Sequence, residues 1–562
     1  MKNRLFLLTF VLSLPLAIFA QDDAVVEEAV WAETGTLAGM VTDVSSGAAL
    51  PGANVVVEGT DLGAAADASG SYLIENVPAG SYTVTASVIG YTSSSESVTV
   101  GTGTAVVNFS LATAVLQMSS LEVLASRAGE NTPVAYTNVS KADMEFRLGS
   151  QDIPMALNTT PSVYATGQGG GAGDARINVR GFNQRNVAVM INGVPQNDME
   201  NGWVYWSNWD GVGDATQSIQ LQRGLSAVNL AAPSIGGSMN IITDPTAVES
   251  GGLLKQELGA GGFLKTSINY NTGLINDNMA FSATIVRKTG DGVIDKTWTD
   301  AWAYYFGASY ALNSTNRFEL YAIGAPQRHG QNLYKQNIGA YDHAFAESIT
   351  GYRAYDTDAI ASDGKFKEAG RFFNQNWSPI SSSYKGQQYW YMYGDKTRER
   401  HDPNYLNERE NFFHKPLINL NHFLTINDQM RLSSILYWSG GSGGGTGTYG
   451  RIPTMDADGV TGLEDYKFYY GRSPWTRDWD ALVEMNSGDD DTVYVDKRVL
   501  PRTHGSGNNQ SVGILRNSIN RQWTIGLISK LNYDMSDDVK LEFGVDWRTA
   551  EIEHAREVRD LM

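Results

Sequence analysis

The stretch RINVRGFNQRNVAVMINGVP, residues 176–195, decides how the middle of this chain folds. Its apolar residues alternate along one face of a predicted strand: Val187, Val189 and Ile191. Side chains two residues apart share a face of a strand, so this face would enter a core. Asn192-Gly193 follows at once, and this dipeptide tolerates the positive φ angles of a tight turn. The stretch therefore predicts a buried strand that ends in a short turn.

Large aromatic side chains follow in an otherwise polar run, VPQNDMENGWVYWSNWDG, residues 194–211. They are Trp203, Tyr205, Trp206 and Trp209. Aromatic rings of this size either fill a core or present flat faces to rings, sugars and apolar organic molecules. The sequence leaves both interpretations open: packing inside the protein, or contact with a ligand.

Composition limits the class of protein. With 562 residues the chain is too long for one domain, and it contains no cysteine, so no disulfide supports its folding. Its formal net charge of −19 argues against a nucleic-acid partner, because no basic surface is available to replace counterions. Aromatic residues and glycine are frequent in this polar chain, with Trp 13, Tyr 27, Phe 19 and Gly 59, which suits a membrane-spanning β-barrel.

The first residues predict export. A positive start at 1–4 precedes an apolar run at 5–18, and cleavage after Ala20 would remove a signal peptide of residues 1–20. A membrane anchor is the alternative, but the run is shorter than the ~20 residues that a spanning helix needs. We therefore expect the mature protein to be exported.

Residues 36–112 resemble a carboxypeptidase regulatory-like domain. Short β-prone runs alternate with turn residues at intervals of about 8–12 residues, which is typical of an all-β domain. The resemblance is carried by GMVTD at 39–43, LPGANV at 50–55, DASGSY at 67–72 and VPAGSY at 77–82. It implies a β-sandwich without a catalytic role. Taken alone, this segment would also suit an accessory module of a secreted enzyme.

Residues 128–245 resemble the plug domain of outer-membrane TonB-dependent receptors. The marks are an Arg-Gly-Phe strand, an Asn-Gly-Val-Pro turn and a Gly-Gly-x-x-Asn-Ile-Ile-Thr strand. The structural positions of these motifs are Arg180, Gly181, Asn192, Gly193, Arg223, Gly224, Gly236 and Gly237. An arginine among them could pair with a barrel carboxylate or lie solvated at a strand end. The resemblance implies an α+β plug whose apex meets the ligand, with these candidate residues: Phe182, Asn183, Gln184, Arg185, Trp203, Tyr205, Trp206 and Trp209.

The linker at 113–127 contains one short β-prone run. Its residues are Leu121, Glu122, Val123, Leu124 and Ala125. An ordinary linker strand is one interpretation. The other is an edge strand for a partner, because an extended segment can join an exposed sheet through its backbone. The plug resemblance makes this run the candidate TonB box, the segment that contacts the periplasmic protein TonB.

Residues 246–562 alternate like the strands of a transmembrane antiparallel β-barrel. VKLEFGVDWRTAEI at 539–552 shows the alternation clearly. Short polar joints, such as NDN at 276–278, contrast with long connections near 326–410 and 440–520, as in outer-membrane barrels. About nine or ten strands of ~10 residues fit this region, whereas large plugged barrels have about twenty-two. We therefore expect a mainly β protein with a sandwich, a plug and a partial barrel, and a truncated chain.

No motif predicts catalysis, a cofactor or a metal site. The seven histidines show no zinc-type spacing, and no nucleophile stands beside a base. DADGVTGLED, from Asp456 to Asp465, carries carboxylates that could ligate Ca²⁺, but it lacks the closing Glu of an EF-hand loop. The missing Glu favours the alternative, an acidic surface loop, over a calcium site.

The expected function is energy-coupled uptake of a large scarce solute, for which siderophores, corrinoids, oligosaccharides and peptides are candidates. Expected partners are TonB with its inner-membrane energising complex, outer-membrane lipid, an extracellular solute of small or medium size and, as a further candidate, a surface lipoprotein. The barrel would lie in the outer membrane, with the sandwich and linker in the periplasm. A surface adhesin or a signalling receptor on the same scaffold is the alternative.

Overall fold

The chain forms two compact units, Met1–Ala114 and Val115–Met562, and each is described by itself. The computed structural model describes residues 33–44, 46–88, 91–112, 134–170, 173–224, 234–333, 338, 341–351, 371–386, 388–389, 397–398, 400–450, 452–455, 461–462, 476–487, 492–495, 498–501, 511, 513–536 and 539–562. The expected signal peptide at 1–20 and the candidate TonB box at 121–125 lie outside these residues.

The first unit is a sandwich of two sheets. Its strands are β1 (Thr34–Asp43), β2 (Asn54–Val57), β3 (Gly63–Ala65), β4 (Ser71–Pro78), β5 (Gly80–Ser87), β6 (Ser94–Val100), β7 (Thr104–Val106) and β8 (Phe109–Leu111). One sheet has the order β4-β1-β7, with β8 also paired to β1, and the other has the order β3-β2-β5-β6. Leu37, Val55 and Tyr72 lie in the shared core, and the hydroxyl of Tyr72 donates to the carbonyl of Val107 over 2.7 Å.

The second unit begins with a small α+β region at 135–247. Its elements are β9 (Ala135–Ser140), α1 (Lys141–Leu148), η2 (Ile153–Leu157), β10 (Val163–Thr166), β11 (Arg176–Val179), β12 (Phe182–Asn183), η3 (Gln184–Asn186), β13 (Val187–Ile191), β14 (Val194–Pro195), η4 (Trp206–Trp209), η5 (Val212–Ala215), β15 (Ser218–Arg223), β16 (Gly237–Ile242) and η6 (Pro245–Ala247). One sheet has the order β14-β13-β16-β15-β9, and a second has the order β10-β11-β12.

The strand that opened the sequence analysis, β13, lies in the middle of this region. It pairs with β16 in parallel and with β14 through the turn at Asn192-Gly193. All five of its residues are buried, including Ala188 and Met190 on the second face. Both faces of β13 are covered, so its sequence is apolar throughout rather than strictly alternating.

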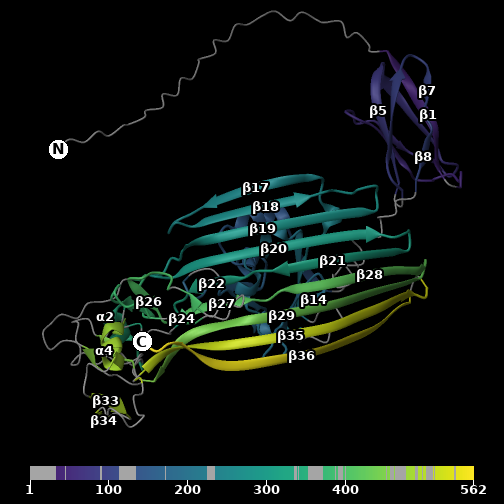
Figure 1. Cartoon of the computed structure of the whole chain (residues 1–562). Coiled ribbons are helices and arrows are strands. Elements are labelled where there is room, and N and C mark those ends of the chain that lie inside the picture. The colour runs from purple at the N-terminus through teal and green to yellow at the C-terminus, as the bar shows by residue number, and fades with distance from the viewer. Residues whose placement is uncertain are drawn as a thin grey trace, which may run out of the picture. The chain divides into compact units, whose positions relative to one another are not determined.

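A large antiparallel sheet follows, and Figure 1 shows its long strands side by side. The strands are β17 (Gly251–Leu258), β18 (Leu264–Asn271), β19 (Met279–Asp291), β20 (Trp298–Ala311), β21 (Asn316–Gly324), β22 (Gln327–Gly330), β27 (Glu410–His414), β28 (Leu417–Asn427), β29 (Met430–Gly450), β35 (Gly513–Asp534) and β36 (Lys540–Asp560). Prolines at 326 and 416 separate β21 from β22 and β27 from β28, because proline has no N–H for the ladder. Counting each broken strand once reduces the eleven described strands to nine spans.

The two rims of this sheet differ in their connections. At one rim, β18 to β19, β20 to β21, β28 to β29 and β35 to β36 are joined by short turns. At the other rim, residues 331–409 and 451–512 form long connections. The second connection is shorter than the sequence suggested, because the glycine-rich end of β29 pairs residue for residue with β35 as far as Gly450 and Gly513. This asymmetry is the one expected of an outer-membrane barrel.

The long connections contain small elements of their own. These are α2 (His343–Ser348), β23 (Trp377–Pro379), β24 (Gln388–Tyr389), β25 (Thr397–Arg398), β26 (Tyr405–Asn407), β30 (Thr454–Met455), β31 (Thr461–Gly462), β32 (Thr476–Arg477), α4 (Trp479–Ser487), β33 (Thr492–Val495) and β34 (Arg498–Pro501). None of the helices in the described part of the chain has both the length and the apolar character to cross a bilayer.

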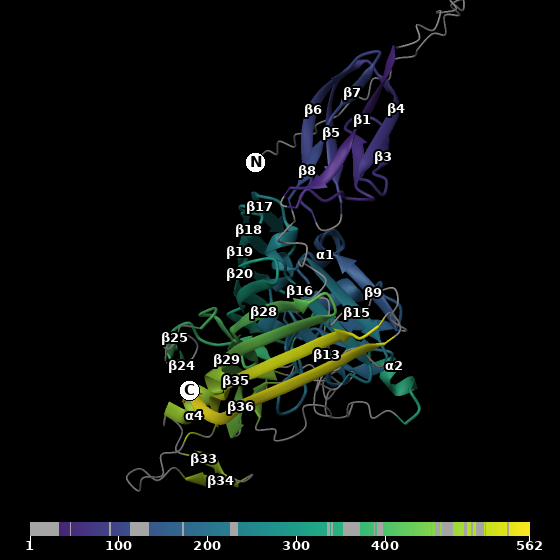
Figure 2. The same ribbon diagram turned by 90° about the vertical axis from the view of Figure 1, so that its right-hand side faces the viewer.

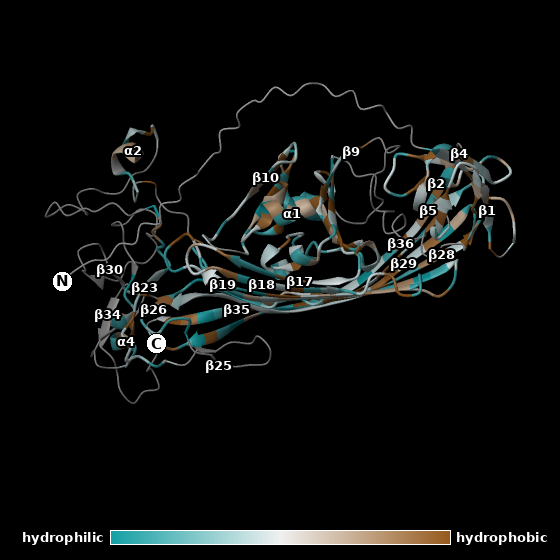
Figure 3. Ribbon diagram, turned by 90° about the horizontal axis from the view of Figure 1, so that it is seen from above, coloured by the Kyte–Doolittle hydropathy of each residue, from teal (hydrophilic) through white to brown (hydrophobic). Residues whose placement is uncertain are grey.

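The α+β region packs on one face of the large sheet. Figures 2 and 3 show α1 and the neighbouring elements on that side. A single hydrophobic core joins the two: Val189 and Trp206 of the α+β region share it with Tyr305, Tyr321 and Tyr437 of the sheet. The mainly β fold class, with a sandwich, a plug-like domain and a partial barrel, is therefore confirmed.

Candidate functional site

The large sheet is apolar on one face and polar on the other. Exposed apolar residues lie on the face away from the α+β region: Ile268, Phe281, Ile285, Trp302, Phe306, Leu320, Ile418, Leu420, Leu436, Trp438, Ile525 and Leu527. The opposite face carries buried polar residues: Lys265, Ser267, Asn269, Thr284, Lys288, Arg317, Glu319, Asn419 and Asn421. A soluble protein would bury the apolar face. Lipid contact explains the reversal, since barrel strands alternate apolar outside and polar inside.

Buried ion pairs join the α+β region to the polar face of the sheet. The Lys288 ammonium of β19 lies 2.8 Å from an Asp210 carboxylate oxygen, and the Lys265 ammonium of β18 lies 2.7 Å from Asp214. All four side chains are nearly excluded from solvent. Because charges removed from water are costly unless paired, each pair fixes the position of one surface on the other.

A third contact between the same two surfaces involves Asp174. Its carboxylate lies 3.1 Å from Nε2 of His329 in β22, and the amide of Gln331 donates to both of its oxygens. Burial alone would raise the pKa of Asp174, but the charge and hydrogen bond of His329, with the Gln331 amide, hold that pKa below its usual range. Asp174 is therefore ionised at neutral pH.

Asp152 lies next to this network without a direct cation. Its carboxylate accepts hydrogen bonds from the backbone N–H groups of Gly173 and Ala175, at 2.8 and 2.9 Å. Burial, followed by the negative charge of Asp210, raises the pKa of Asp152 to about 6, although Lys288 and the two N–H groups act in the opposite direction. Asp152 thus titrates closer to neutrality than an ordinary aspartate.

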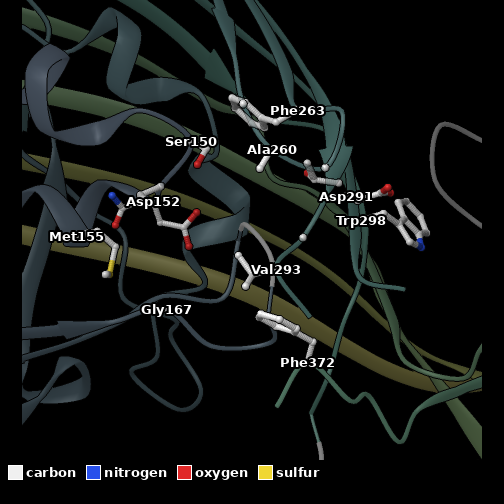
Figure 4. A pocket seen from close by; sticks show the side chains of 16 residues that line it. Ser150, Asp152, Met155, Gly167, Ala260, Phe263, Asp291, Val293, Trp298 and Phe372 are labelled. Atoms are coloured by element: carbon white, nitrogen blue, oxygen red, sulfur yellow. The ribbon is translucent and has the colours of Figure 1, made fainter. Parts of the chain in front are cut away.

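A cavity of about 520 Å³ lies between this region and the rim that carries the long connections (Figure 4). Asp152 and Met155 line it from one side, and Phe263, Asp291 and Val293 line it from the sheet. Phe372, from the first long connection, also reaches it. Its lining is mainly apolar and includes two carboxylates, those of Asp152 and Asp291.

Direct hydrogen bonds join the α+β region to the rim beside the cavity. The N–H of Val293 donates to the carbonyl of Gly170 over 3.0 Å, and the Thr297 hydroxyl donates to the same carbonyl over 3.3 Å. A Cβ atom at Gly170 would lie 2.5 Å from the Ile294 side chain. Glycine at this position therefore permits the close approach between the α+β region and the rim.

The Asn192-Gly193 turn shows how the sequence motif positions the domain. Both residues have positive φ, 49° and 80°. The Asn192 amide donates to the Thr243 hydroxyl over 2.8 Å, and the Thr243 N–H donates back to Asn192 Oδ1 over 2.9 Å. A Cβ atom at Gly193 would lie 2.9 Å from Cδ1 of Ile435 in β29. The motif thus joins the end of β13 to the end of β16 and seats the turn on the sheet.

The two motif arginines hold the α+β region together internally. Arg180 donates to the carbonyl of Arg223 over 3.4 Å, and Arg223 donates to the carbonyls of Pro161 and Tyr136. Gly224 allows the Arg180 guanidinium to approach, since a Cβ there would lie 2.3 Å from its Nη1. Gly181 follows Arg180 in a turn, Gly237 begins the strand β16 beside Gln222, and Gly236 precedes it next to Phe182. Among the described residues, the buried ion pairs between the α+β region and the sheet join acids of the region, Asp210 and Asp214, to lysines of the sheet. The charges are therefore the reverse of the expected pair, which joined an arginine of this region to a carboxylate of the barrel.

The four aromatic residues separate into two pairs. Trp206 and Trp209 are 2% exposed, within the core that joins the region to the sheet. Gln184 is also buried: its side-chain carbonyl accepts from the Trp206 indole N–H over 3.1 Å, and its amide donates to the carbonyl of Val204 over 2.6 Å. Trp206, Trp209 and Gln184 therefore pack inside the protein, and their side chains offer no surface to a ligand in this structure.

Trp203 and Tyr205 lie nearer the surface. The Trp203 ring is half-buried between two guanidinium groups, with Arg176 at 4.9 Å and Arg185 at 4.8 Å from its centroid. Tyr205 is 45% exposed. Phe182 is 39% exposed, and Asn183 and Arg185 are exposed as well. Trp203, Tyr205 and these neighbours remain candidates for ligand contact.

A second cavity of about 90 Å³ lies under Tyr205. Glu200 forms one wall, and its carboxylate lies 2.8 Å from Nε2 of His554 in β36. Phe413 and Gln522 complete the wall on the sheet side. This cavity is smaller and more polar than the first.

Several residues named from the sequence fall outside the described part of the chain. These include the candidate TonB box at 121–125 and most of the acidic stretch at 456–465. Within the described residues, no three His, Asp or Glu side chains gather as a metal site.

Comparison with known proteins agrees with the geometry. The family TonB-dependent Receptor Plug Domain matches residues 128–238. The chain carries a TonB-dependent receptor plug domain. The family CarboxypepD_reg-like domain matches residues 37–123. The resemblance drawn from the sequence is therefore confirmed, and the plug domain packs on the polar face of the sheet.

The similar proteins are transport receptors. The Ferric enterobactin receptor of Pseudomonas aeruginosa is 25% identical over 222 residues, 36% of this chain and 28% of that protein. The Vitamin B12 transporter BtuB of Vibrio vulnificus is 24% identical over 236 residues, 40% of this chain and 37% of that protein. Among solved structures, the ferric citrate transporter FecA in the unliganded form has a TM-score of 0.46 and 12% identity, over 79% of this chain and 50% of that one. The matches thus span less than two fifths of either curated relative.

Proposed function

We propose that the protein is a receptor for TonB-dependent uptake of a scarce extracellular solute across the outer membrane. The observation that carries this proposal is the plug, packed on the polar face of a sheet whose other face suits lipid. A plug held by a few buried ion pairs closes a passage that it can also open. The names of the two curated relatives, one for a ferric chelate and one for vitamin B12, support solutes of the siderophore or corrinoid kind.

The route of the solute follows from the two rims. Longer loops of outer-membrane barrels lie outside the cell and short turns face the periplasm. The plug surface at the rim of the long connections would therefore meet the solute from outside. The exposed rings of Tyr205 and Phe182 and the half-buried ring of Trp203 would contact it at the plug apex. No covalent chemistry is needed for this function.

The plug's edge strand suggests how force would open the passage. β9 is the last strand of its sheet, and it pairs only with β15 among the described strands. The ladder begins at Ala135, opposite Arg223. A pull on the preceding linker by TonB, energised by its inner-membrane complex, would separate this ladder one pair at a time from Ala135. Breaking the hydrogen-bonded residue pairs of a ladder one after another needs less force than breaking them all at once. An edge strand such as β9 is therefore well placed to be pulled away from its sheet.

The candidate TonB box, residues 121–125, stands close before β9 in the sequence and is part of the proposal. Backbone pairing of this segment with TonB would couple the plug to the proton gradient. A lipoprotein at the cell surface is a further candidate partner for the long connections.

Growth and uptake measurements test this function. A deletion strain would be grown on defined iron, cobalamin and glycan sources, with and without a functional TonB. We expect one source to require both the receptor and TonB. If the receptor binds cells or surfaces but no solute uptake depends on it, the adhesin or signalling alternative replaces transport.

A further inference from the structure

We infer that the cavity of about 520 Å³ at the plug–rim boundary binds an organic cation with an apolar body, such as a ring-bearing amine or quaternary ammonium compound, in preference to an anionic chelate. That this cation is the transported solute rests on the proposed function. That the cavity binds such a cation does not depend on the proposed function.

Charge is the first reason. The lining contains two carboxylates, Asp152 and Asp291, and none of the described residues that line it is a lysine, arginine or histidine. Asp291 is exposed and has no ion-pair partner within the described residues. A concave site lined by one sign of charge concentrates ions of the opposite sign. The cavity would therefore attract cations and repel anions.

Cations near the cavity are engaged elsewhere or neutral. Lys288, the cation that acts on Asp152, is paired with Asp210 at 2.8 Å. Arg328 lies over the Trp298 ring but forms an ion pair with Glu410, 2.9 Å away. His401 stacks on the same ring at 3.8 Å, and burial lowers the pKa of His401, so it is neutral at neutral pH. The positive groups around Trp298 are thus already paired or uncharged.

The apolar wall is the second reason. Phe263 and Phe372 lie on opposite sides of the cavity in Figure 4, with Val293 between them and Met155 to the left. Aromatic faces attract cations through the quadrupole of the ring, and the attraction grows when water is excluded. Apolar side chains would bury the carbon skeleton of the ligand. A small hydrated metal ion would gain nothing from this wall, whereas an organic cation uses both the wall and the carboxylates.

Binding of two acridines of similar size and opposite charge tests the inference. Proflavine is a cation, and acridine-9-carboxylate is an anion. Each would be titrated into the purified receptor in detergent micelles at neutral pH and followed by fluorescence anisotropy. We expect proflavine to bind, with an affinity that falls as salt is added, and the anion to bind more weakly.

Substitutions assign the binding to the cavity. Asp291→Asn should weaken proflavine binding roughly fivefold, a factor that corresponds to about 1 kcal/mol for one partly exposed charge pair. Asp277→Asn is the matched control, because it removes the same charge from an exposed turn at the opposite rim. It should leave the affinity unchanged. Phe263→Ala should weaken proflavine binding as well, through loss of the aromatic wall.

Two results would overturn the inference. One is binding of the anion as tight as that of the cation. The other is an equal effect of Asp291→Asn and Asp277→Asn, which would indicate nonspecific attraction to an acidic protein. If no solute source requires both the receptor and TonB for growth, the transport function is contradicted while this binding result stands, so the two failures are distinguishable.

Discussion

Asp210 of the plug and Lys288 of strand β19 form a buried ion pair with 2.8 Å between the carboxylate oxygen and the ammonium nitrogen. The two residues are 78 positions apart in the sequence, and neither belongs to a motif. Removing one partner leaves the other charge buried without compensation. This pair is therefore a sensitive measure of how firmly the plug is seated.

Lys288→Met should destabilise plug seating by about 3–5 kcal/mol, because Asp210 is left charged in a buried site. The double variant Lys288→Met with Asp210→Leu should recover most of that loss, since an apolar pair needs no charge compensation. Urea-induced unfolding of the plug, followed by tryptophan fluorescence, measures both. Lys540→Met is the control: its ammonium lies 3.9 Å from Asp534 in an exposed pair, so the effect should stay below about 1 kcal/mol. Equal losses in the single and double variants would show that Lys288 contributes packing rather than charge.

The strands of the large sheet could be predicted from the sequence because their alternation is local. In β36, the apolar positions Phe543, Val545 and Trp547 recur at every second residue and face outward as expected. The end of β29 could not be predicted in the same way. Its glycine-rich run has no alternation and low strand propensity, and only the partner strand β35 provides the backbone hydrogen bonds that extend it to Gly450.

Only part of the candidate site could be predicted from the sequence. The motif Asn192-Gly193 predicted its own turn, because the φ angles are a property of those two residues. Trp203 and Trp206 could not be separated, since the irregular backbone between them has no period that assigns a face. The ion pairs to Lys265 and Lys288 and the acid-lined cavity were missed. They join residues far apart in the sequence, and inward charges on predicted barrel strands were the one available signal.

The stability of the plug should depend on pH through Asp152. The pKa of its carboxyl is raised to about 6 in the folded protein by burial and by Asp210, and it is about 3.9 in an unfolded chain. Between about pH 4 and pH 6 the folded plug therefore keeps a proton that the unfolded chain releases, so this contribution to stability falls as pH rises and is flat above that window.

Urea midpoints between pH 4 and pH 7 measure this effect in the parent and in Asp152→Asn. The variant has no charge at this position, and contributions from Asp174 and other groups are common to both proteins. The unfolding free energy of the parent minus that of the variant should decline by roughly 2–3 kcal/mol across the window. A difference that does not change with pH would show that Asp152 has an ordinary pKa in the folded plug.

The aromatic pairs at the apex should respond differently to truncation. Trp206→Ala removes a buried side chain and its bond to Gln184, and we expect a loss of about 3–5 kcal/mol in plug stability. Trp203→Ala should cost only about 1 kcal/mol in stability. It should weaken binding of the transported solute by ~1–3 kcal/mol if the ring stacks on it. Thermal unfolding and calorimetric titration separate the two effects. Unchanged affinity in Trp203→Ala would limit ligand contact to other residues of the apex.

Gly193→Ala should destabilise the seated plug by about 1–3 kcal/mol, because an L-residue is strained at the φ of 80°. Contact with the Ile435 side chain adds to this cost. In a background that carries Ile435→Ala, the contact with the new methyl group is relieved but the backbone strain remains. Gly193→Ala should therefore cost less stability in that background than in the parent, but still more than zero. A double-mutant cycle on urea midpoints measures the coupling. Strictly additive effects would mean that the turn does not press on the sheet at Ile435.

The last prediction concerns the candidate TonB box, whose value would lie in backbone pairing. Val123→Pro removes a ladder donor and fixes φ, so it should abolish solute uptake. Val123→Ala keeps the N–H and should have a mild effect. Both variants should bind solute at the cell surface like the parent, because the substitution lies in the linker and the expected solute-contacting residues belong to the plug. Uptake and surface binding of a labelled solute, measured on the same cells, distinguish lost coupling from lost recognition. If Val123→Pro imports solute at the parental rate, the strand that contacts TonB lies elsewhere in the chain.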